Sequence, residues 1–269
     1  MRQDFCRAAA SYDEAAVLAQ ETGRRLAKRL DWVKIEPKRV ADIGCATGDG
    51  IRELQRRYPQ ALPVAVDFAR PMLQSVRERV PLMWRLRGKG PRLVNADVGA
   101  LPLAANSLDL VWSNLMLHWL DEPLGAFKEL HRVLAVGGLL TFAMLGPDTL
   151  KELRAAGAVS TRRFLDMHDV GDMLAAAGFA DPVMDMEIIA LTYRRPRQFL
   201  ADQRRLGVRD GLLGQMNWRD WRRVLAAWQS QGDEGGRLPV SFEIVFGHAW
   251  KAAPKVAADG RAIIRFSKP

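Results

Sequence analysis

Short apolar runs alternate with segments of helical periodicity along the first 146 residues. The runs are rich in Val, Ile and Leu, which is typical of strands buried on both faces of a parallel sheet. They occupy residues 40–43, 64–66, 93–95, 108–112 and 139–144. Between them, apolar residues recur every three or four positions, as on the buried face of a helix. The alternation predicts a right-handed parallel sheet that is covered by helices on both faces.

After Gly146 the alternation of strand-like and helix-like segments becomes less regular, but helices and strands are still predicted. The pattern predicts a helix over 167–177, a strand over 183–193, Arg-rich helices over 196–206 and 218–228, and a last strand over 243–250. With the five earlier runs, this makes seven strands. We therefore expect an α/β protein with a Rossmann-like, doubly wound and mostly parallel seven-stranded sheet, with a helical insertion before the last strand.

Three further stretches are assigned by composition. Gly137 and Gly138 are expected to form the turn that stops one helix and begins the strand over 139–144. Residues 231–236 are predicted to be a loop. Residues 251–269 resemble a basic tail, in which 262–266 can add a short strand.

Length and composition exclude several classes of protein. A chain of 269 residues, 48% hydrophobic and 26% charged, can bury a sizeable core. Its two cysteines, Cys6 and Cys45, lie too far apart for a disulfide framework or a Cys-rich zinc site. The first twenty residues lack a signal-peptide pattern, and the longest apolar run is shorter than the ~20 residues of a membrane span. We expect a soluble, unsecreted protein of the reducing cytoplasm.

The sharpest local signal lies where the first predicted strand meets the first helix. Residues 40–50 read VADIGCATGDG, with glycines at 44, 48 and 50. Glycine there lets the backbone pass close to a ligand at an open helix N-terminus. A dinucleotide-binding turn needs glycine at the position of Ala46, and a phosphate-binding P-loop needs a following Lys. The turn therefore favours a nucleoside that carries no diphosphate.

Acidic residues close the first three strands. Asp67 follows Gly44 by 23 residues, about where a carboxylate accepts both ribose hydroxyls in this architecture. Asp97 ends the third strand, where it can accept a hydrogen bond from an adenine amino group. With Asp42 in the first strand, they suit a ligand with a cationic or donor-rich rim. The alternative is that each aspartate only caps the helix that follows.

The strings around these residues resemble the class I S-adenosylmethionine-dependent methyltransferases. They are DIGCATG (42–48), AVDFARPML (65–73) and DVGALP (97–102), in the family's order and spacing. The resemblance implies that the turn wraps the methionine end of the cofactor, that Asp67 holds the ribose and that Asp97 reads adenine. Many members have glycine where this chain has Ala46. The cofactor-binding residues it implies are Asp42, Gly44, Cys45, Ala46, Gly48, Asp67, Phe68, Met72, Asp97, Val98, Asn114 and Leu115.

Flanking segments are similar to a narrower group, the malonyl-acyl-carrier-protein O-methyltransferases of biotin synthesis. They include FCRAAASYD (5–13), WSNLMLHW (112–119), LGPDTL (145–150) and FGHAW (246–250). The resemblance implies one methyltransferase domain over 1–250, with a lid at 1–30, a cofactor-binding core at 38–146 and a substrate-facing part at 147–250. It implies methylation of the free carboxylate of malonyl-acyl-carrier protein or malonyl-coenzyme A. Relatives of this pattern leave two alternatives open: methylation of another small acid or metabolite, and a non-methylating assembly factor or hydroxylase.

The chemistry this implies needs little from side chains. A sulfonium methyl is already activated and a carboxylate is already an anion at pH 7, so alignment and exclusion of water supply most of the rate. We expect Tyr12, on the lid, to close the pocket and touch the substrate carboxylate. His118 and Trp119 are the other candidate catalytic residues. The alternatives are an exposed helix tyrosine, a structural histidine and a core tryptophan.

Positive charge is concentrated at the C-terminal end of the chain. The whole chain carries a net charge of +9, and residues 194–269 hold 15 basic and 7 acidic residues. An acyl carrier protein is strongly acidic, so an arginine cluster can steer it. The alternatives are a solvated helix face and nucleic acid, against which no recognised binding module appears. The histidines show no metal-binding pairing, and we expect a metal-free monomer. The candidate carrier-binding residues are Arg194, Arg195, Arg204, Arg205 and Arg209.

Overall fold

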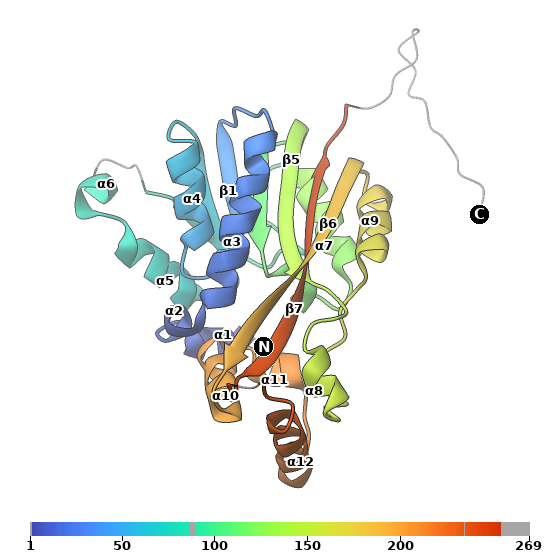
Figure 1. The fold of residues 1–269 in the computed structure, drawn as a ribbon. Coiled ribbons are helices and arrows are strands. Elements are labelled where there is room, and N and C mark those ends of the chain that lie inside the picture. The colour runs from blue at the N-terminus through green and yellow to red at the C-terminus, as the bar shows by residue number, and fades with distance from the viewer. Residues whose placement is uncertain (1, 87–89, 234, 254–269) are drawn as a thin grey trace, which may run out of the picture.

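A twisted seven-stranded sheet forms the centre of the computed structural model, which describes residues 2–86, 90–233 and 235–253 (Figure 1). The strand order is β3-β2-β1-β4-β5-β7-β6. The first five strands run parallel, and β7 is antiparallel to both β5 and β6. This confirms the predicted fold class. The strands are β1 (Arg39–Ile43), β2 (Leu62–Asp67), β3 (Arg92–Asn95), β4 (Leu108–Asn114), β5 (Leu134–Leu145), β6 (Ala180–Tyr193) and β7 (Leu238–Trp250).

The central strands are apolar because both of their faces are covered. In β1 and β4 nearly every residue is buried, whereas the edge strand β3 is partly open. One face packs against α3 (Val17–Arg29), α4 (Asp49–Arg57) and α5 (Arg70–Arg79). The opposite face packs against α7 (Pro123–Val133) and α9 (Met167–Ala176). Each helix turns its apolar stripe to the sheet, so two separate cores form.

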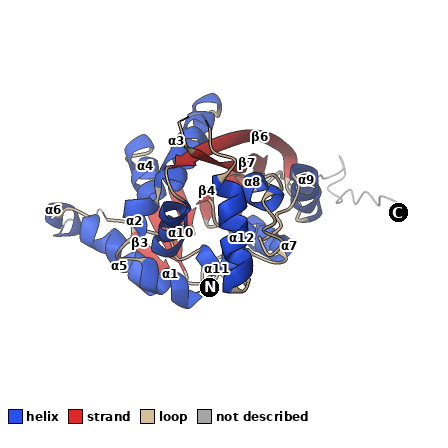
Figure 2. Cartoon of the chain, turned by 60° about the horizontal axis from the view of Figure 1, so that its bottom comes forward, coloured by secondary structure: helices blue, strands red, loops and turns tan. Residues whose placement is uncertain are grey.

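Helices from the two ends of the chain meet at the carboxyl end of the parallel strands. Figure 2 shows α10, α11 and α12 beside the N-terminal helices α1 and α2, and α10 packs directly on α2. These elements form a cap over the edge at which ligands bind in open α/β sheets. The remaining helices are α1 (Arg2–Ala8), α2 (Tyr12–Ala15), α6 (Leu82–Leu86), α8 (Lys151–Ala155), α10 (Pro196–Arg205), α11 (Arg209–Leu213) and α12 (Trp218–Gln229), with 3-10 turns η1 (Leu30–Trp32) and η2 (Leu117–Trp119).

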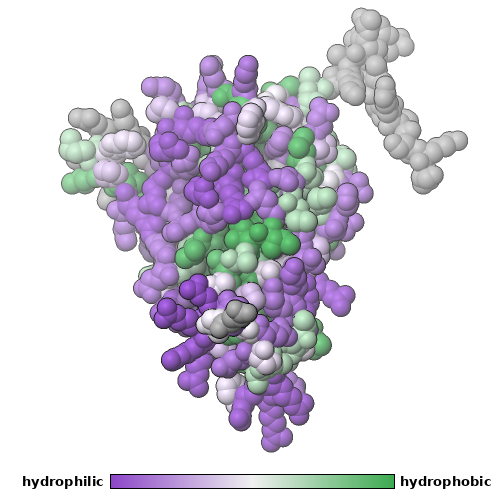
Figure 3. Space-filling model, viewed as in Figure 1, coloured by the Kyte–Doolittle hydropathy of each residue, from purple (hydrophilic) through white to green (hydrophobic). Residues whose placement is uncertain are grey.

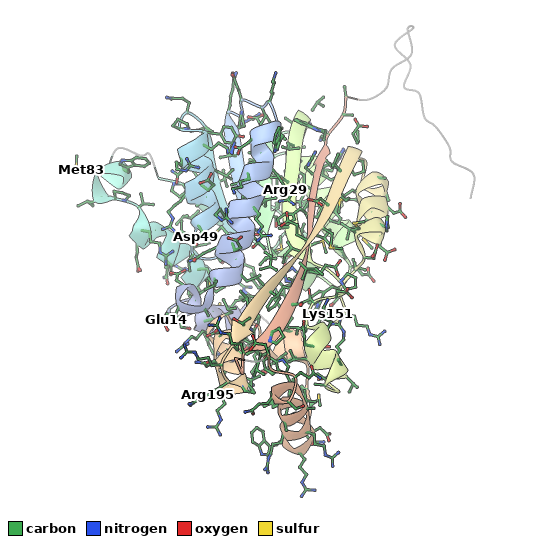
Figure 4. All side chains as sticks on the ribbon, in the orientation of Figure 1. Glu14, Arg29, Asp49, Met83, Lys151 and Arg195 are labelled. Atoms are coloured by element: carbon green, nitrogen blue, oxygen red, sulfur yellow. The ribbon has the colours of Figure 1, made fainter. Side chains whose placement is uncertain are left out.

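Helix α3 is held across the antiparallel part of the sheet by charge. Its Arg29 lies 2.6 Å from a carboxylate oxygen of Glu187 on β6 and places its guanidinium 3.7 Å from the centre of the Phe246 ring. Arg25 also pairs with Glu187. Figure 4 shows Arg29 reaching from α3 towards β6. Arginine suits this position because it can pair with a carboxylate and stack on a ring at once.

Several predicted boundaries were wrong. The strands β5, β6 and β7 begin three to five residues before the apolar runs that predicted them, because backbone pairing continues through residues that interrupt those runs, such as Gly137, Gly138, Pro239 and Ser241. Gly137 and Gly138 do not stop α7, which ends at Val133. They lie inside β5, where Gly137 donates to the carbonyl of Lys251 and Gly138 accepts from its amide. The strand predicted over 262–266, and the tail beyond residue 253, lie outside the described residues. Within the described ranges, no helix is both long and apolar enough to cross a bilayer.

Gly247 lets β7 pass between its neighbours, and this gives a test of the packing. A methyl group there would lie 2.6 Å from Cε1 of Phe142 and 2.9 Å from Sδ of Met184. We expect Gly247→Ala to lower the free energy of unfolding by about 1–3 kcal/mol, the usual cost of overpacking. Urea unfolding followed by circular dichroism measures it.

Gly125 provides the matched control. It lies within the exposed side of α7, and a methyl group there meets no atom within 4 Å. Because glycine weakens a helix interior, Gly125→Ala should raise the free energy of unfolding by up to about 1 kcal/mol. Equal effects of the two substitutions would contradict the packing described for β7.

Candidate active site

One large cleft lies at the carboxyl ends of β1, β2 and β4, beneath the N-terminal helices. It encloses about 1290 Å³, counted with its open mouth. Most of the residues that the sequence predicted for the site line it. They are Tyr12, Gly44, Ala46, Asp67, Phe68, Met72, Asp97, Val98, Asn114, Leu115, His118 and Trp119.

Three predicted cofactor-binding residues do not line this cleft. Asp42 and Cys45 are buried and border a smaller space behind the glycine turn, together with Tyr12 and Asn114. Gly48 borders neither space. Its φ of 95° turns the chain into α4, so its position is set by the backbone. The sequence correctly grouped these residues in one turn, but it did not show which of them face the open side.

The glycine turn is a strained segment of backbone that its neighbours hold in place. Gly44, Ala46 and Gly48 all have positive φ, at 77°, 44° and 95°. The carbonyl of Val66 accepts from the amides of Gly44 and Cys45 at 2.9 and 3.0 Å. Ala46 adopts a left-handed conformation that costs a non-glycine residue about 1–2 kcal/mol. This explains physically why glycine is common at that position in the resembling family.

Asp67 ties the turn to the second strand. Its side chain is nearly buried, and one oxygen accepts from the amide of Ala46 at 3.0 Å while the other accepts from the amide of Ala69 at 2.8 Å. Burial raises the pKa of Asp67, and hydrogen bonds from the amides of Ala69, Ala46 and Phe68 oppose that rise. A carboxylate has about four lone-pair sites, so the three amides leave acceptor capacity for a ligand hydroxyl. The capping alternative and the ligand-binding prediction are therefore compatible.

Asp97 lies at the rim of the same cleft. Its side chain is exposed and accepts from the amide of Gly99 at 2.8 Å. Val98 beside it is buried, and Val98 and Phe68 give the cleft apolar lining close to Asp97 and Asp67 in the sequence. A flat heterocycle with an exocyclic amino group matches this combination of an apolar slot and an acceptor.

Asn114 carries an unsatisfied acceptor at the other end of the cleft. Its Nδ2 donates to the carbonyl of Ala19 at 2.8 Å, but its buried Oδ1 has no partner among the described residues. Leu115, which follows it, has a φ of 52°. Burial raises the pKa of nearby Asp42 to about 8. Unsatisfied acceptors and strained backbone of this kind gather where a ligand completes the site.

These groups fit S-adenosylmethionine. Its ribose hydroxyls and its ammonium group are donors, which Asp67 and the Oδ1 of Asn114 can accept, and it carries no phosphate. Within the described ranges, no three His, Cys, Asp or Glu side chains gather to hold a metal ion, and the metal-free expectation stays a prediction.

Hydrogen bonds and an ion pair join helix α2, in the segment predicted to be a lid, to the glycine turn. Asp13 on α2 accepts from the hydroxyl of Thr47 at 2.6 Å and pairs with Arg79 of α5. Arg79 also donates to the carbonyl of Thr47 at 3.1 Å. Tyr12 directly precedes Asp13, so the contacts of Asp13 also hold Tyr12, which lines the cleft. Burial raises the pKa of Tyr12, with the charge of Asp67 adding to the effect, so its hydroxyl stays a donor.

Aromatic side chains form part of the wall of the cleft. Phe5 of α1 packs edge-on against Phe68 and Trp119, with ring centres 5.8 and 6.0 Å apart. His118 is buried, and burial, with nearby Arg162, lowers its pKa to about 3. Its Nδ1 accepts from the amide of Leu145 at 3.4 Å, which assigns the proton to Nε2. His118 is thus a neutral donor at pH 7 and is not a charged residue.

The five candidate carrier-binding arginines differ in availability. Arg194, Arg195 and Arg204 are exposed. Arg205 lies 3.4 Å from Glu14 of α2 and 3.3 Å from Asp202, so it joins α10 to the lid. Arg209 pairs with Asp210 at 2.6 Å. Figure 4 shows Glu14 and Arg195 at the same end of the molecule.

Sequence reasoning missed the far half of the cleft. The end of β6, the helices α10 and α11, and β7 complete its wall with Leu191, Tyr193, Gln203, Leu206, Val208, Leu212 and Phe242. The sequence contained only a weak indication of these residues. Gln203 follows Phe199 by four residues, so it is a polar residue on the apolar face of a predicted helix. Nothing in the sequence placed that helix over the cleft.

Comparisons with known proteins agree with this geometry. A family model described as a methyltransferase domain matches residues 41–142. The YcgJ protein of Bacillus subtilis superposes with a TM-score of 0.60 at 13% identity, over 87% of this chain and 99% of that one. The fold and cleft thus define a class I methyltransferase.

The malonyl-acyl-carrier-protein O-methyltransferase of Gallionella capsiferriformans is 48% identical over 99% of this chain and 95% of its own. That of Laribacter hongkongensis is 46% identical over 99% and 94%. The chain belongs to the malonyl-acyl-carrier-protein O-methyltransferase family.

Asp13 offers a test of the closed lid. Asp13→Ala removes both the bond from Thr47 and the pair with Arg79, so we expect the lid to loosen and cofactor affinity to fall by about 1–2 kcal/mol, roughly 5- to 30-fold. Isothermal titration with S-adenosylmethionine measures the dissociation constant. Asp31→Ala removes another Asp–Arg pair, with Arg57, away from the cleft, and should leave the constant unchanged. An equal loss in both variants would contradict the anchoring role.

Proposed function

We propose that this chain methylates the free carboxylate of a malonyl thioester on acyl carrier protein, with S-adenosylmethionine as cofactor. The product, a malonyl methyl ester, primes the pimeloyl chain of biotin synthesis. The observation that carries the proposal is identity of 48% to a relative of that name along nearly the whole chain, lid and insertion included. The mostly apolar part of the cleft that β6, α10, α11 and β7 line supports the proposal. It leaves room for a short acyl chain beside the part that we assign to the cofactor.

The residues present suit a reaction governed by alignment. When bound, S-adenosylmethionine supplies an electrophilic methyl group, whose carbon–sulfur bond breaks as the acceptor oxygen bonds to carbon, with no proton or electron from the protein. Asp67, Asp97 and Asn114 orient the cofactor end. Tyr12 closes the cleft, and Trp119 with Phe5 excludes water, which strengthens every charge interaction inside. His118 can donate its Nε2 proton in a hydrogen bond to the acyl carbonyl.

An acidic carrier protein is the proposed macromolecular partner. Arg194, Arg195 and Arg204 are exposed beside the lid, and charge there raises the encounter rate with an acidic partner. Figure 3 shows an apolar patch in the middle of this face, and Val17 on α3 and Ile188 on β6 are exposed apolar side chains. An apolar centre with a charged rim is the usual composition of a protein interface. We propose a monomeric cytoplasmic enzyme that does not act on nucleic acid.

Methyl transfer from labelled S-adenosylmethionine tests the activity. We expect label in malonyl-carrier as a base-labile methyl ester, and none in acetyl-carrier, which has no free carboxylate. A panel of small acids tests the alternative acceptors in the same assay. Cofactor binding without transfer to any acceptor would overturn the proposal and favour a non-methylating role.

Charge reversal tests the carrier surface. The double variant Arg194→Glu, Arg204→Glu should raise the KM for malonyl-carrier roughly tenfold at low salt and less at high salt, because screening weakens the encounter. Cofactor affinity should stay the same. The control is Lys28→Glu, Lys38→Glu, which changes net charge equally at exposed positions on other elements. An unchanged KM at low ionic strength would show that these arginines do not bind the carrier and belong only to a solvated helix face.

A further inference from the structure

The acceptor half of the cleft contains polar groups but no positive charge. Among its described lining residues, Tyr193 and Gln203 are polar and the rest of that half is apolar. Neither Lys nor Arg is among the described residues that line the cleft at all. A cleft that takes an anion usually offers a guanidinium or an ammonium. This one offers a hydroxyl and an amide.

Gln203 is a buried polar side chain without a partner. It lies on α10, one turn after Phe199, and is 3% exposed. Its backbone carbonyl accepts from the amide of Val208 at 3.0 Å, but its side-chain amide bonds to no other described residue. Its amide atoms are not among the described side-chain atoms that are both sealed from solvent and unpaired, so the amide reaches the cleft that the residue lines. A ligand in the cleft can accept a hydrogen bond from Nε2.

Tyr193 is held rigidly at the same wall. Its ring packs edge-on against Phe199 at 5.4 Å, and Phe199 packs in the same way against Trp228 at 5.5 Å. Trp228 is fixed in turn, because its Nε1 donates to the carbonyl of Pro239 at 3.2 Å. The Tyr193 hydroxyl bonds to no other described residue. Burial, with the charge of Asp202 adding to it, raises the pKa of Tyr193, so the hydroxyl remains a donor.

We propose that the hydroxyl of Tyr193 and the side-chain amide of Gln203 bind the acceptor carboxylate and set the preference for acyl groups that carry one. This clamp rests on the proposed function. Neutral donors hold the anion without neutralising it, so the attacking oxygen keeps its electron density. A guanidinium in that place would compete with the methyl group for the same charge. The balancing positive charge is then the sulfonium, which strengthens the attraction between the two reactants.

Two conservative variants test the clamp. Gln203→Met keeps the volume and removes the amide, and Tyr193→Phe removes only the hydroxyl. Each should lower kcat/KM for malonyl-carrier at least tenfold and leave the dissociation constant of S-adenosylmethionine within twofold. The selectivity for a carboxylate is measured by the inhibition constant of acetyl-carrier divided by the KM of malonyl-carrier. In both variants this ratio should fall towards one. Gln203→Met should melt at about the wild-type temperature, because it keeps the volume of the side chain and removes no hydrogen bond to another described residue.

The controls are Tyr58→Phe and Gln229→Met, which remove the same groups outside the cleft. Both should match the wild type. A wild type that transfers methyl to malonyl-carrier, with Gln203→Met and Tyr193→Phe equally active and selective, would overturn the clamp alone. Loss of activity in Gln203→Met together with weakened cofactor binding and a lower melting temperature would also overturn it, since it indicates a structural role. A wild type inactive on malonyl-carrier would overturn the proposed function and the clamp together.

Discussion

The rest of the site depends on one constraint, the left-handed turn that joins β1 to α4. Backbone with positive φ at residues 44, 46 and 48 does not hold itself in place. Two hydrogen bonds to the Val66 carbonyl and one to the Asp67 carboxylate hold it against β2. The turn in turn fixes Thr47, to which the lid is anchored through Asp13. The geometry of this turn therefore determines the positions of the backbone at the base of the cleft, of the Asp67 carboxylate and of helix α2.

The cleft is built from both ends of the chain, and these ends are joined to each other. Ser11 of the lid donates to the carbonyl of Arg205 at 3.1 Å, and Glu14 pairs with the side chain of the same arginine. Arg205 makes this link while its side chain stays 47% exposed. Phe5 of α1 and Tyr12 of α2 line the cleft, and α10 brings Gln203 to the same cleft.

The sequence was sufficient wherever the chemistry lies in one contiguous segment. Gly44, Asp67 and Asp97 each follow a strand, and parallel strands bring their ends to a common edge, so the pattern alone predicted their grouping. It failed where tertiary packing decides. Tyr193 and Gln203 lie some 180 residues beyond Tyr12 and carry no local motif, and the charge count over 194–269 did not distinguish Arg205 with its partners from exposed Arg204. The sequence also did not reveal the backbone strain at Ala46, because alanine ordinarily avoids the left-handed conformation that it adopts here.

Charge is distributed in a way that separates recognition from chemistry. The chain has a net charge of +9, yet the described lining of its cleft holds acidic and neutral groups only. Positive charge outside acts at long range on a macromolecular partner and is weakened by salt. Inside, an arginine would bind a carboxylate more strongly but would also make it a poorer nucleophile, so tighter binding of the acceptor would not become a faster reaction. Placing cations on the surface and neutral donors in the cleft satisfies both demands, because the only cation beside the reacting oxygen is then the sulfonium that the reaction consumes.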